Sequence, residues 1–331
     1  MRITQRLSID DLGLAGEMLR RGQLVAFPTE TVYGLGADAF QPEAVRNIYL
    51  AKGRPSDNPL IVHLGSFDQL TEVAMDLPAL AARLIDRFWP GPLTLVLRKT
   101  DRVSDLVSGN LNTVAVRMPN HPIALELLQR AQTPVVAPSA NRSGRPSATH
   151  WQSVLEDLEG RIDGVILGES TSIGLESTVL DLTQSVPCIL RAGAITAEEL
   201  RDVCPDVRHA SETSHENELR KSPGTRHRHY QPTAMVLLDC ARTSHGAHPI
   251  TKDPRLLHKK IAWIGLGNPP ALDWLVMEPC SSVEVYARRV YAFFREMDHL
   301  GIEVIVCSLV DEAGIGLALN DRLNRAANDR I

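Results

Sequence analysis

The sequence predicts an α/β protein of two domains, the first on a twisted mixed sheet and the second, smaller one on a doubly wound parallel sheet. The chain has 331 residues, which exceeds the usual size of one hydrophobic core. Short strand patterns dominate residues 1–204, with helices interspersed, whereas residues 205–232 are polar and lack periodicity. Strand and helix patterns then alternate through residues 233–331, which is typical of a doubly wound domain.

Composition and charge exclude several classes of protein. The net charge of −5 argues against nucleic-acid binding through bulk electrostatics, so we expect no stable DNA binding. The five cysteines form no Cys-x-x-Cys pair, which excludes a zinc ribbon and fits a reducing cytoplasm. No run of about twenty apolar residues could span a membrane. We therefore expect a soluble cytoplasmic protein.

The first predicted elements are a capped helix and a buried strand. The helix begins after Ser8 and stops at Gly22, with apolar residues along one face. The strand over 24–27 then runs into a polar, glycine-containing turn over 28–36. Turns after strand ends are where α/β proteins bind ligands. The turn also matches the loose dinucleotide fingerprint G-x-G-x-x-A, which we discount because polar residues separate the strand from the glycines.

A dense polar segment follows at residues 52–63. A short helix over 42–51 ends at a glycine, so Lys52 lies at a helix end. Two prolines hold the next residues extended until a buried strand begins. Cations on such a stiff segment suit a polyphosphate, and a charged surface loop fits the pattern equally well. The candidate binding residues here are Lys52, Arg54, Asn58 and His63.

A buried arginine lies in the next group of elements. A helix over 80–88 and a strand over 93–97 precede a strand over 112–119, in which Thr113 and Arg117 share a face. A guanidinium among apolar residues requires a partner, because an unpaired buried charge is costly. We predict that this partner is a carboxylate of the substrate, and the alternative is a carboxylate of the protein.

Polar residues also gather beyond three later strands. The loop 139–147 combines serines, an asparagine and backbone amides that suit phosphate or ribose, and a flexible serine-rich loop is the alternative. Ser177 heads a further strand, and Arg191 ends another. The elements predicted for this region are a helix over 121–131, strands over 134–137, 163–167, 174–182 and 188–191, and a capped helix from Thr196.

The predicted linker over 205–232 ends in a segment, 222–230, that is rich in cations and rings. We predict that this segment folds over the first domain's pocket as a lid, and an inert linker is the alternative. His209, His227 and His229 lack a cysteine or carboxylate at a familiar metal-ligand spacing, so we predict no metal site there. The elements predicted beyond the linker are strands over 234–238, 260–264 and 301–306 and helices over 283–300 and 320–325.

Five motifs, taken in order, closely resemble those of the threonylcarbamoyl-AMP synthase family. They cover nearly the whole chain, and their co-occurrence makes the resemblance specific. It implies the two-domain form of that family, in which a YrdC-like α/β domain precedes a linker and a small Rossmann-like domain. The motifs are Phe27-Pro-Thr-Glu-Thr-Val-Tyr-Gly-Leu-Gly, Lys52-Gly-Arg-Pro, Pro138-Ser-Ala-Asn-x-Ser-Gly, Gly174-x-Glu-Ser-Thr and Ser222-Pro-Gly.

The resemblance implies synthesis of threonylcarbamoyl-AMP and pyrophosphate from L-threonine, bicarbonate and ATP, for threonylcarbamoyladenosine in tRNA. Mg²⁺ would accompany ATP, and a tRNA threonylcarbamoyl transferase complex would take the product. By motif, the catalytic residues would be Lys52 and Arg54. The ATP-binding residues would be Lys52, Arg54, Asn58, Thr113, Ala137, Ser139, Asn141, Ser147, Arg191 and Tyr230, and the threonine-binding residues Thr31, His63, Arg117 and Ser177.

Two other functions compete with this one. A YrdC-like module could hold structured RNA without synthase activity, although the net negative charge argues against that as the main role. Transfer from carbamoyl phosphate is the second, as in the related domain of hydrogenase maturation proteins. Those proteins carry Cys-x-x-Cys zinc motifs, which this sequence lacks.

Overall fold

The chain divides into two compact units in a computed structural model that describes residues 3–210, 221–222, 230–240, 249–327 and 329–330. The division between residues 227 and 228 falls inside the predicted linker. Most of the predicted lid, residues 223–229 with His227 and His229, lies outside the described residues. The first unit comprises 1–143, 147–172 and 176–227, and the second comprises 144–146, 173–175 and 228–331.

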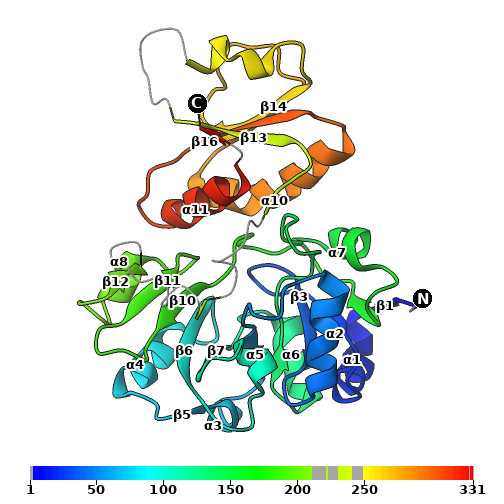
Figure 1. The fold of residues 1–331 in the computed structure, drawn as a ribbon, viewed down its shortest axis with the longest axis vertical. Coiled ribbons are helices and arrows are strands. Elements are labelled where there is room, and N and C mark those ends of the chain that lie inside the picture. The colour runs from blue at the N-terminus through cyan, green and yellow to red at the C-terminus, as the bar shows by residue number, and fades with distance from the viewer. Residues whose placement is uncertain (1–2, 211–220, 223–229, 241–248, 328, 331) are drawn as a thin grey trace. The chain divides into compact units, whose positions relative to one another are not determined.

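The first unit is built on a mixed sheet, as the sequence predicts. Its strand order is β1-β9-β2-β3-β8-β4-β7-β6-β10-β11-β12, with β5 beside β6 (Figure 1). β4 runs parallel to β7, and β6 antiparallel to it. The strands are β1 (Gln5–Leu7), β2 (Val25–Phe27), β3 (Gly34–Asp38), β4 (Ile61–His63), β5 (Ala74–Met75), β6 (Leu93–Lys99), β7 (Thr113–Arg117), β8 (Val135–Val136), β9 (Gly164–Ile166), β10 (Thr178–Asp181), β11 (Cys188–Arg191) and β12 (Arg208–His209).

Helices with one apolar face cover this sheet. In α2 the apolar residues Val45, Ile48 and Tyr49 are buried, and Gly53 ends the helix at a φ of 62°. Buried residues of α1 and α6 pack in one core with β2 and β8. The helices are η1 (Ile9–Asp11), α1 (Leu12–Arg20), α2 (Pro42–Lys52), α3 (Leu70–Val73), α4 (Ala79–Phe88), α5 (Asp105–Ser108), α6 (Pro122–Ala131), α7 (Trp151–Leu158) and α8 (Ala197–Arg201).

The glycine turn predicted over 28–36 is wrong in its second half, because Gly34 begins β3, which pairs antiparallel with β2. A Cβ at Gly36 would lie 2.9 Å from the ring of Phe27 and 3.1 Å from the carbonyl oxygen of Val25. Glycine is therefore needed for close approach between strands, and neither Gly34 nor Gly36 has a positive φ. The polar turn is limited to residues 28–33.

Residues 208–209 and 221 of the predicted linker are attached to the first unit's sheet. Arg208 and His209 form β12, which adds a parallel strand beside β11. The Nζ of Lys221 donates to the Oδ2 of Asp181, a fully buried residue of β10, over 2.7 Å. Residues near both ends of this stretch are therefore held by specific contacts with the sheet.

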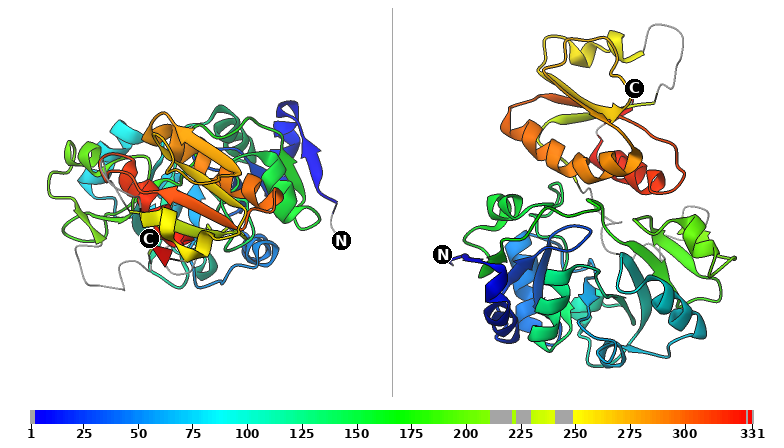
Figure 2. Two further views of the ribbon diagram at one scale, coloured as in Figure 1. Left: turned by 90° about the horizontal axis from the view of Figure 1, so that it is seen from above. Right: turned by 180° about the vertical axis from the view of Figure 1, so that it is seen from behind.

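The second unit contains a parallel sheet in the order β15-β14-β16-β13-β17, which confirms the predicted class. α10 and α11 cover one face (Figures 1 and 2). Leu256 of η4 packs with Trp263 in a hydrophobic core that includes no residue of these two helices. Among the described residues, no helix is long and apolar enough to cross a membrane. The elements are β13 (Met235–Asp239), η3 (Pro249–Lys252), η4 (Pro254–Leu256), β14 (Ile261–Leu266), β15 (Val276–Cys280), α10 (Val283–His299), β16 (Val304–Ser308), α11 (Gly316–Ala326) and β17 (Asp329–Arg330).

Candidate active site

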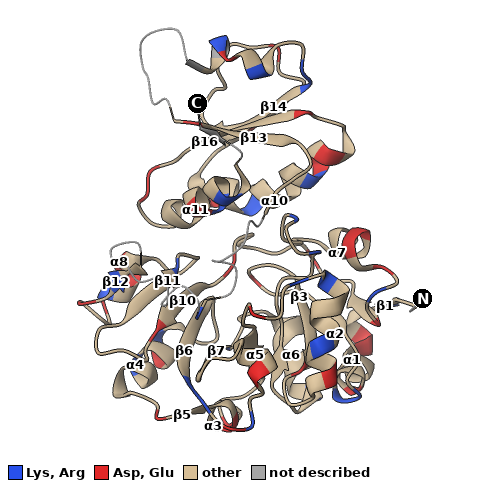
Figure 3. Ribbon diagram, in the orientation of Figure 1, with Lys and Arg blue, Asp and Glu red and all other residues tan. Residues whose placement is uncertain are grey.

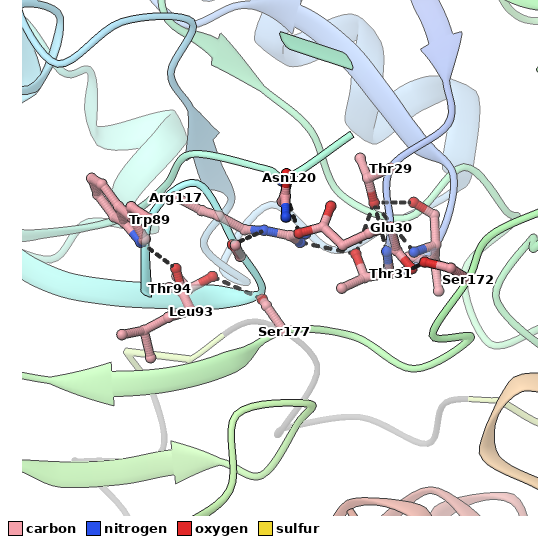
Figure 4. A network of polar contacts seen from close by, with 12 residues as sticks. Thr29, Glu30, Thr31, Trp89, Leu93, Thr94, Arg117, Asn120, Ser172 and Ser177 are labelled. Atoms are coloured by element: carbon pink, nitrogen blue, oxygen red, sulfur yellow. Dashed lines mark hydrogen bonds and ion pairs between the residues drawn. The ribbon is translucent and has the colours of Figure 1, made fainter. Parts of the chain in front are cut away.

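Arg117 ends β7 in a buried polar network that includes a protein carboxylate (Figure 4). Its side chain is 4% exposed, and Nη2 lies 2.7 Å from Oε1 of Glu30. Nη1 donates to Oγ1 of Thr31 over 2.9 Å, and Nε donates to the carbonyl of Gly91 over 3.2 Å. The pair with Glu30 contradicts the prediction that the partner of Arg117 is not a protein carboxylate, whereas contact of Arg117 with a substrate carboxylate stays a prediction. A guanidinium buried this deeply requires a counter-charge, which Glu30 supplies.

The turn after β2 fixes Glu30 and Thr31 in place. Oγ1 of Thr29 accepts hydrogen bonds from the amides of Thr31 and Val32 and donates to the carbonyl of Val32 over 2.7 Å. Such bonds from a threonine hydroxyl to its own turn hold the backbone in one conformation. Oε1 of Glu30 also accepts from the amide of Asn120 over 3.0 Å. The two threonines thus shape the turn, and the glutamate ties it to the end of β7.

His63 lies opposite Arg117 in the ladder between β4 and β7. Its imidazole is buried, and Nδ1 is 3.3 Å from the carbonyl oxygen of Ile61. Burial, followed by the nearby charge of Arg117, lowers the pKa of His63 to about 3. The imidazole is therefore neutral at physiological pH and can act on a ligand only through hydrogen bonds.

We expect His63 to make the protein sensitive to acid. Its pKa is 6.5 when unperturbed and about 3 in the fold, so between these values the unfolded chain binds a proton that the folded chain does not. Stability is fully present above this window and falls as the pH drops through it. Between pH 7 and pH 5, wild type should lose about 1 to 2 kcal/mol more unfolding free energy than His63→Gln. Denaturant titrations at both pH values measure this, and parallel losses would contradict it.

Lys52, at the end of α2, is buried and bound to the loop after β8. Its Nζ donates to the carbonyl oxygens of Ser139 and Asn141, each at 2.5 Å. The amide of Ser143 in turn donates to the carbonyl of Lys52 over 2.9 Å. Burial and the neighbouring Arg54 lower the pKa of Lys52. Lys52 thus joins the 52–63 segment to the predicted nucleotide loop, which brings two predicted site regions together.

Asn58 is fully buried, and neither its amide nitrogen nor its amide oxygen has a hydrogen-bond partner in the described part of the chain. The backbone around it is fixed, because the hydroxyl of Tyr49 donates to its carbonyl over 3.1 Å. Nearby, Nη2 of Arg54 donates to the carbonyl of Pro59 over 3.2 Å. A buried amide of this kind is costly unless a ligand satisfies it. Asn58 is therefore a strong candidate for ligand contact.

The loop after β8 is held by backbone hydrogen bonds from several elements. The amide of Ala137 donates to Ile61 in β4 over 2.9 Å, and the amide of Ala140 donates to Tyr33 over 2.7 Å. At the far end of the loop, Oγ of Ser147 donates to Oε1 of Glu176 over 2.7 Å. The loop is therefore an ordered structure and not a flexible serine-rich connection.

Ser177 and Arg191 are brought together beside β6. Nε and Nη2 of Arg191 donate to the carbonyl of Ser177 over 3.1 and 3.0 Å, and Nη2 also reaches its hydroxyl over 3.2 Å. The hydroxyl of Ser177 lies 2.8 Å from that of Thr94. Thr94 was not among the predicted site residues, although a polar residue within the apolar strand 93–97 was a usable signal. Glu30 was not predicted either, although it lies inside the motif that begins at Phe27.

The contacts described above do not include Thr113 or Tyr230, which were also predicted to bind the nucleotide. Thr113 is buried at the first position of β7, whereas Arg117 is at the last. Tyr230 belongs to the second unit, where its ring stacks on Tyr291 with centroids 5.3 Å apart. Its contact with a nucleotide stays a prediction. In the part of the chain that the structure describes, no cluster of three His, Cys, Asp or Glu residues could hold a metal ion.

Comparison with known proteins finds a matching family for each of the two parts of the chain. The family described as "Telomere recombination" matches residues 17–193, and that described as "Threonylcarbamoyl-AMP synthase, C-terminal domain" matches residues 195–328. The threonylcarbamoyl-AMP synthase of Pyrococcus abyssi is 42% identical over 100% of this chain and 98% of its own. That of Bacillus subtilis is 39% identical over 99% and 97%. The crystal structure of P. abyssi Sua5 complexed with L-threonine superposes with a TM-score of 0.89 at 41% identity, covering 100% of this chain and 99% of that one.

Proposed function

The chain belongs to the threonylcarbamoyl-AMP synthase family, and we propose from this premise that it makes threonylcarbamoyl-AMP and pyrophosphate from L-threonine, bicarbonate and ATP. One observation supports the proposal above all others. Residues from four distant segments, 27–36, 52–63, 137–147 and 174–191, are linked by hydrogen bonds and strand pairing around β4, β6, β7 and β8. They supply buried cations and neutral donors, as the proposed reaction requires.

The proposed reaction needs two anions to meet. The amino group of threonine combines with bicarbonate or carbon dioxide to give a carbamate, and a carbamate oxygen attacks the α-phosphorus of ATP as pyrophosphate leaves. Positioning and charge neutralisation supply most of the catalysis in such a phosphoryl transfer. Arg117, with Thr31, His63 and Ser177, would hold threonine and its carbamate. The bound L-threonine of the P. abyssi crystal structure supports threonine as the amino-acid substrate.

The nucleotide would lie against the Lys52 side of the site. Lys52 holds the loop 139–147 through two carbonyls, and the side-chain amide of Asn58 has no hydrogen-bond partner among the described residues. Arg54 and Lys52 would neutralise the phosphates, as arginine and lysine commonly do. The remaining proposed nucleotide contacts are Thr113, Ala137, Ser139, Asn141, Ser147, Arg191 and Tyr230.

We propose that Mg²⁺ enters with ATP and neutralises charge on the phosphates. The described residues offer no cluster of three carboxylate, cysteine or histidine side chains, so phosphate oxygens and water would supply most of its ligands, as is usual for this ion.

A tRNA threonylcarbamoyl transferase complex is the proposed user of the product. A reducing cytoplasm is the proposed location, supported by the five free cysteine thiols.

An RNA-binding module without synthase activity is the alternative function. The helices α1, α2 and α10 each carry both acidic and basic residues (Figure 3), so none of them is charged with a single sign. Carbon-13-labelled bicarbonate separates the two functions. With ATP, Mg²⁺ and threonine, we expect mass spectrometry to find the label in a product that contains both threonine and AMP. RNA binding without any labelled product would contradict the proposed activity.

Asn58 gives a test of the nucleotide site that leaves the fold intact. Because its amide makes no hydrogen bond among the described residues, Asn58→Ala should change the melting temperature little. ATP affinity should fall about 5- to 30-fold, the equivalent of about one or two lost hydrogen bonds. Titration calorimetry with a non-hydrolysable ATP analogue measures this. The exposed Asn112→Ala serves as the matched control, and equal affinity of all three proteins would remove Asn58 from the site.

A further inference from the structure

The two carboxylate oxygens of Glu30 have different surroundings. Oε1 accepts from the amide of Asn120 over 3.0 Å and lies 2.7 Å from Nη2 of Arg117. Oε2 is buried and has no hydrogen-bond partner in the described structure. The side chain as a whole is only 8% exposed. A carboxylate oxygen removed from water without a donor is costly, so a ligand that supplies one would stabilise the site.

Hydrogen bonds hold the backbone of the turn that carries Glu30. Oγ1 of Thr29 bonds to two amides and a carbonyl of the turn, and Ser172 donates to the carbonyl of Glu30 over 3.4 Å. Figure 4 shows the carboxylate beside Arg117 and Asn120, within the same network as Thr31. Oε2 of Glu30, which has no hydrogen-bond partner among the described residues, is therefore part of a preorganised site.

The charges next to Oε2 restrict what can bind there. Arg117 presents the opposite charge, and its Nη2 makes an ion pair but no aligned hydrogen bond. The pair thus offers one anionic acceptor and one cationic donor side by side, which complements an amino-acid zwitterion. His121 also lies near Glu30, and burial lowers the pKa of its imidazole. Its imidazole is therefore neutral at pH 7 and leaves the charge of Glu30 uncompensated on that side.

Of the three proposed substrates, only L-threonine carries a cationic donor, because ATP and bicarbonate are anions that a carboxylate repels. We propose that Oε2 of Glu30 accepts a hydrogen bond from the α-ammonium group of L-threonine, while Arg117 binds its carboxylate. This inference rests on the proposed function. It makes Glu30 a substrate-binding residue that places the nitrogen which becomes the carbamate nitrogen, and it predicts selection for amino acids over hydroxy acids.

A pair of ligands tests this assignment directly. (R)-3-Hydroxybutanoate is L-threonine without its amino group, so the ratio of the two affinities isolates the contact to nitrogen. We expect wild type to bind L-threonine about 10- to 100-fold more tightly, and Glu30→Gln to lose most of this preference by weakening threonine alone. Titration calorimetry of both ligands with both proteins measures it. Gln keeps an acceptor for the amide of Asn120 while removing the charge.

Asp38→Asn is the matched control, because Asp38 is another buried carboxylate at the end of β3 whose oxygens are satisfied by Phe40, Gln41 and Thr133. It should leave the ratio unchanged. If Glu30→Gln keeps the wild-type ratio, or weakens both ligands equally, the inference is wrong while the proposed function stands. If that variant does not fold, wild type alone decides, since equal affinity for the two ligands would also overturn the assignment. Wild type that binds neither ligand would contradict the proposed function itself.

Discussion

Arg117→Met is expected to cause the largest loss of stability and to abolish threonine-dependent activity. The substitution leaves the carboxylate of Glu30 buried without its counter-charge, since Arg117 and Glu30 are 4% and 8% exposed. Breaking a buried pair in this way costs about 3 to 5 kcal/mol. It also removes the donors to Thr31 and Gly91. Denaturant unfolding measures the first effect, and pyrophosphate release with and without threonine measures the second.

The double variant Arg117→Met with Glu30→Gln separates the structural role of the pair from its chemical role. Removing both charges should restore most of the lost stability, because no uncompensated charge remains. Activity should not return, because both proposed threonine contacts are gone. Arg130→Met is the control, since Arg130 makes an exposed pair with Glu126 that is worth little. A double variant as active as wild type would exclude both residues from the site.

Lys52→Met should lower ATP-dependent turnover by about 100-fold while changing the fold little. Methionine has a similar length and no charge, so it avoids a cavity and removes the buried ammonium. The carbonyls of Ser139 and Asn141 then lose their donor, and the loop that we propose to hold the nucleotide loses its attachment to α2. Steady-state kinetics at varied ATP, with a melting temperature for each protein, measure both effects.

A control on the same helix makes the Lys52 result specific. Arg46 lies on the exposed part of α2, where it pairs with Glu43, so Arg46→Met should behave as wild type. Wild-type kinetics in Lys52→Met would contradict its assignment to the site. A large drop in melting temperature would instead show that the lysine is needed mainly for folding.

Local patterns explain which parts of the fold were predictable. α2 was predictable because a proline at its start and Gly53 at its end act through neighbouring residues alone. The mixed sheet was predictable as a class, but its strand order was not, because pairing joins segments far apart in the chain. β3 was missed because its glycines resemble a turn in the sequence, and only the contact with Phe27 explains them.

The candidate site, like the fold, was predictable from the sequence only in part. Lys52, Asn58 and Arg117 were identified because charged or amide side chains beside apolar strands are unusual in sequence. Their partners were not, because the carbonyls bound by Lys52 and the carboxylate beside Arg117 come from distant segments. Glu30 lies between two threonines in a turn, where a glutamate is ordinarily exposed, and only its burial marks it as unusual.

Pyrophosphate release tests the central claim most directly. Purified protein is supplied with ATP, Mg²⁺, L-threonine and bicarbonate, and each of the last two is then omitted in turn, with dissolved carbon dioxide removed when bicarbonate is left out. The proposed function predicts release only when both are present, because the attacking carbamate forms from the two together. Undiminished pyrophosphate release without threonine or without bicarbonate would contradict it.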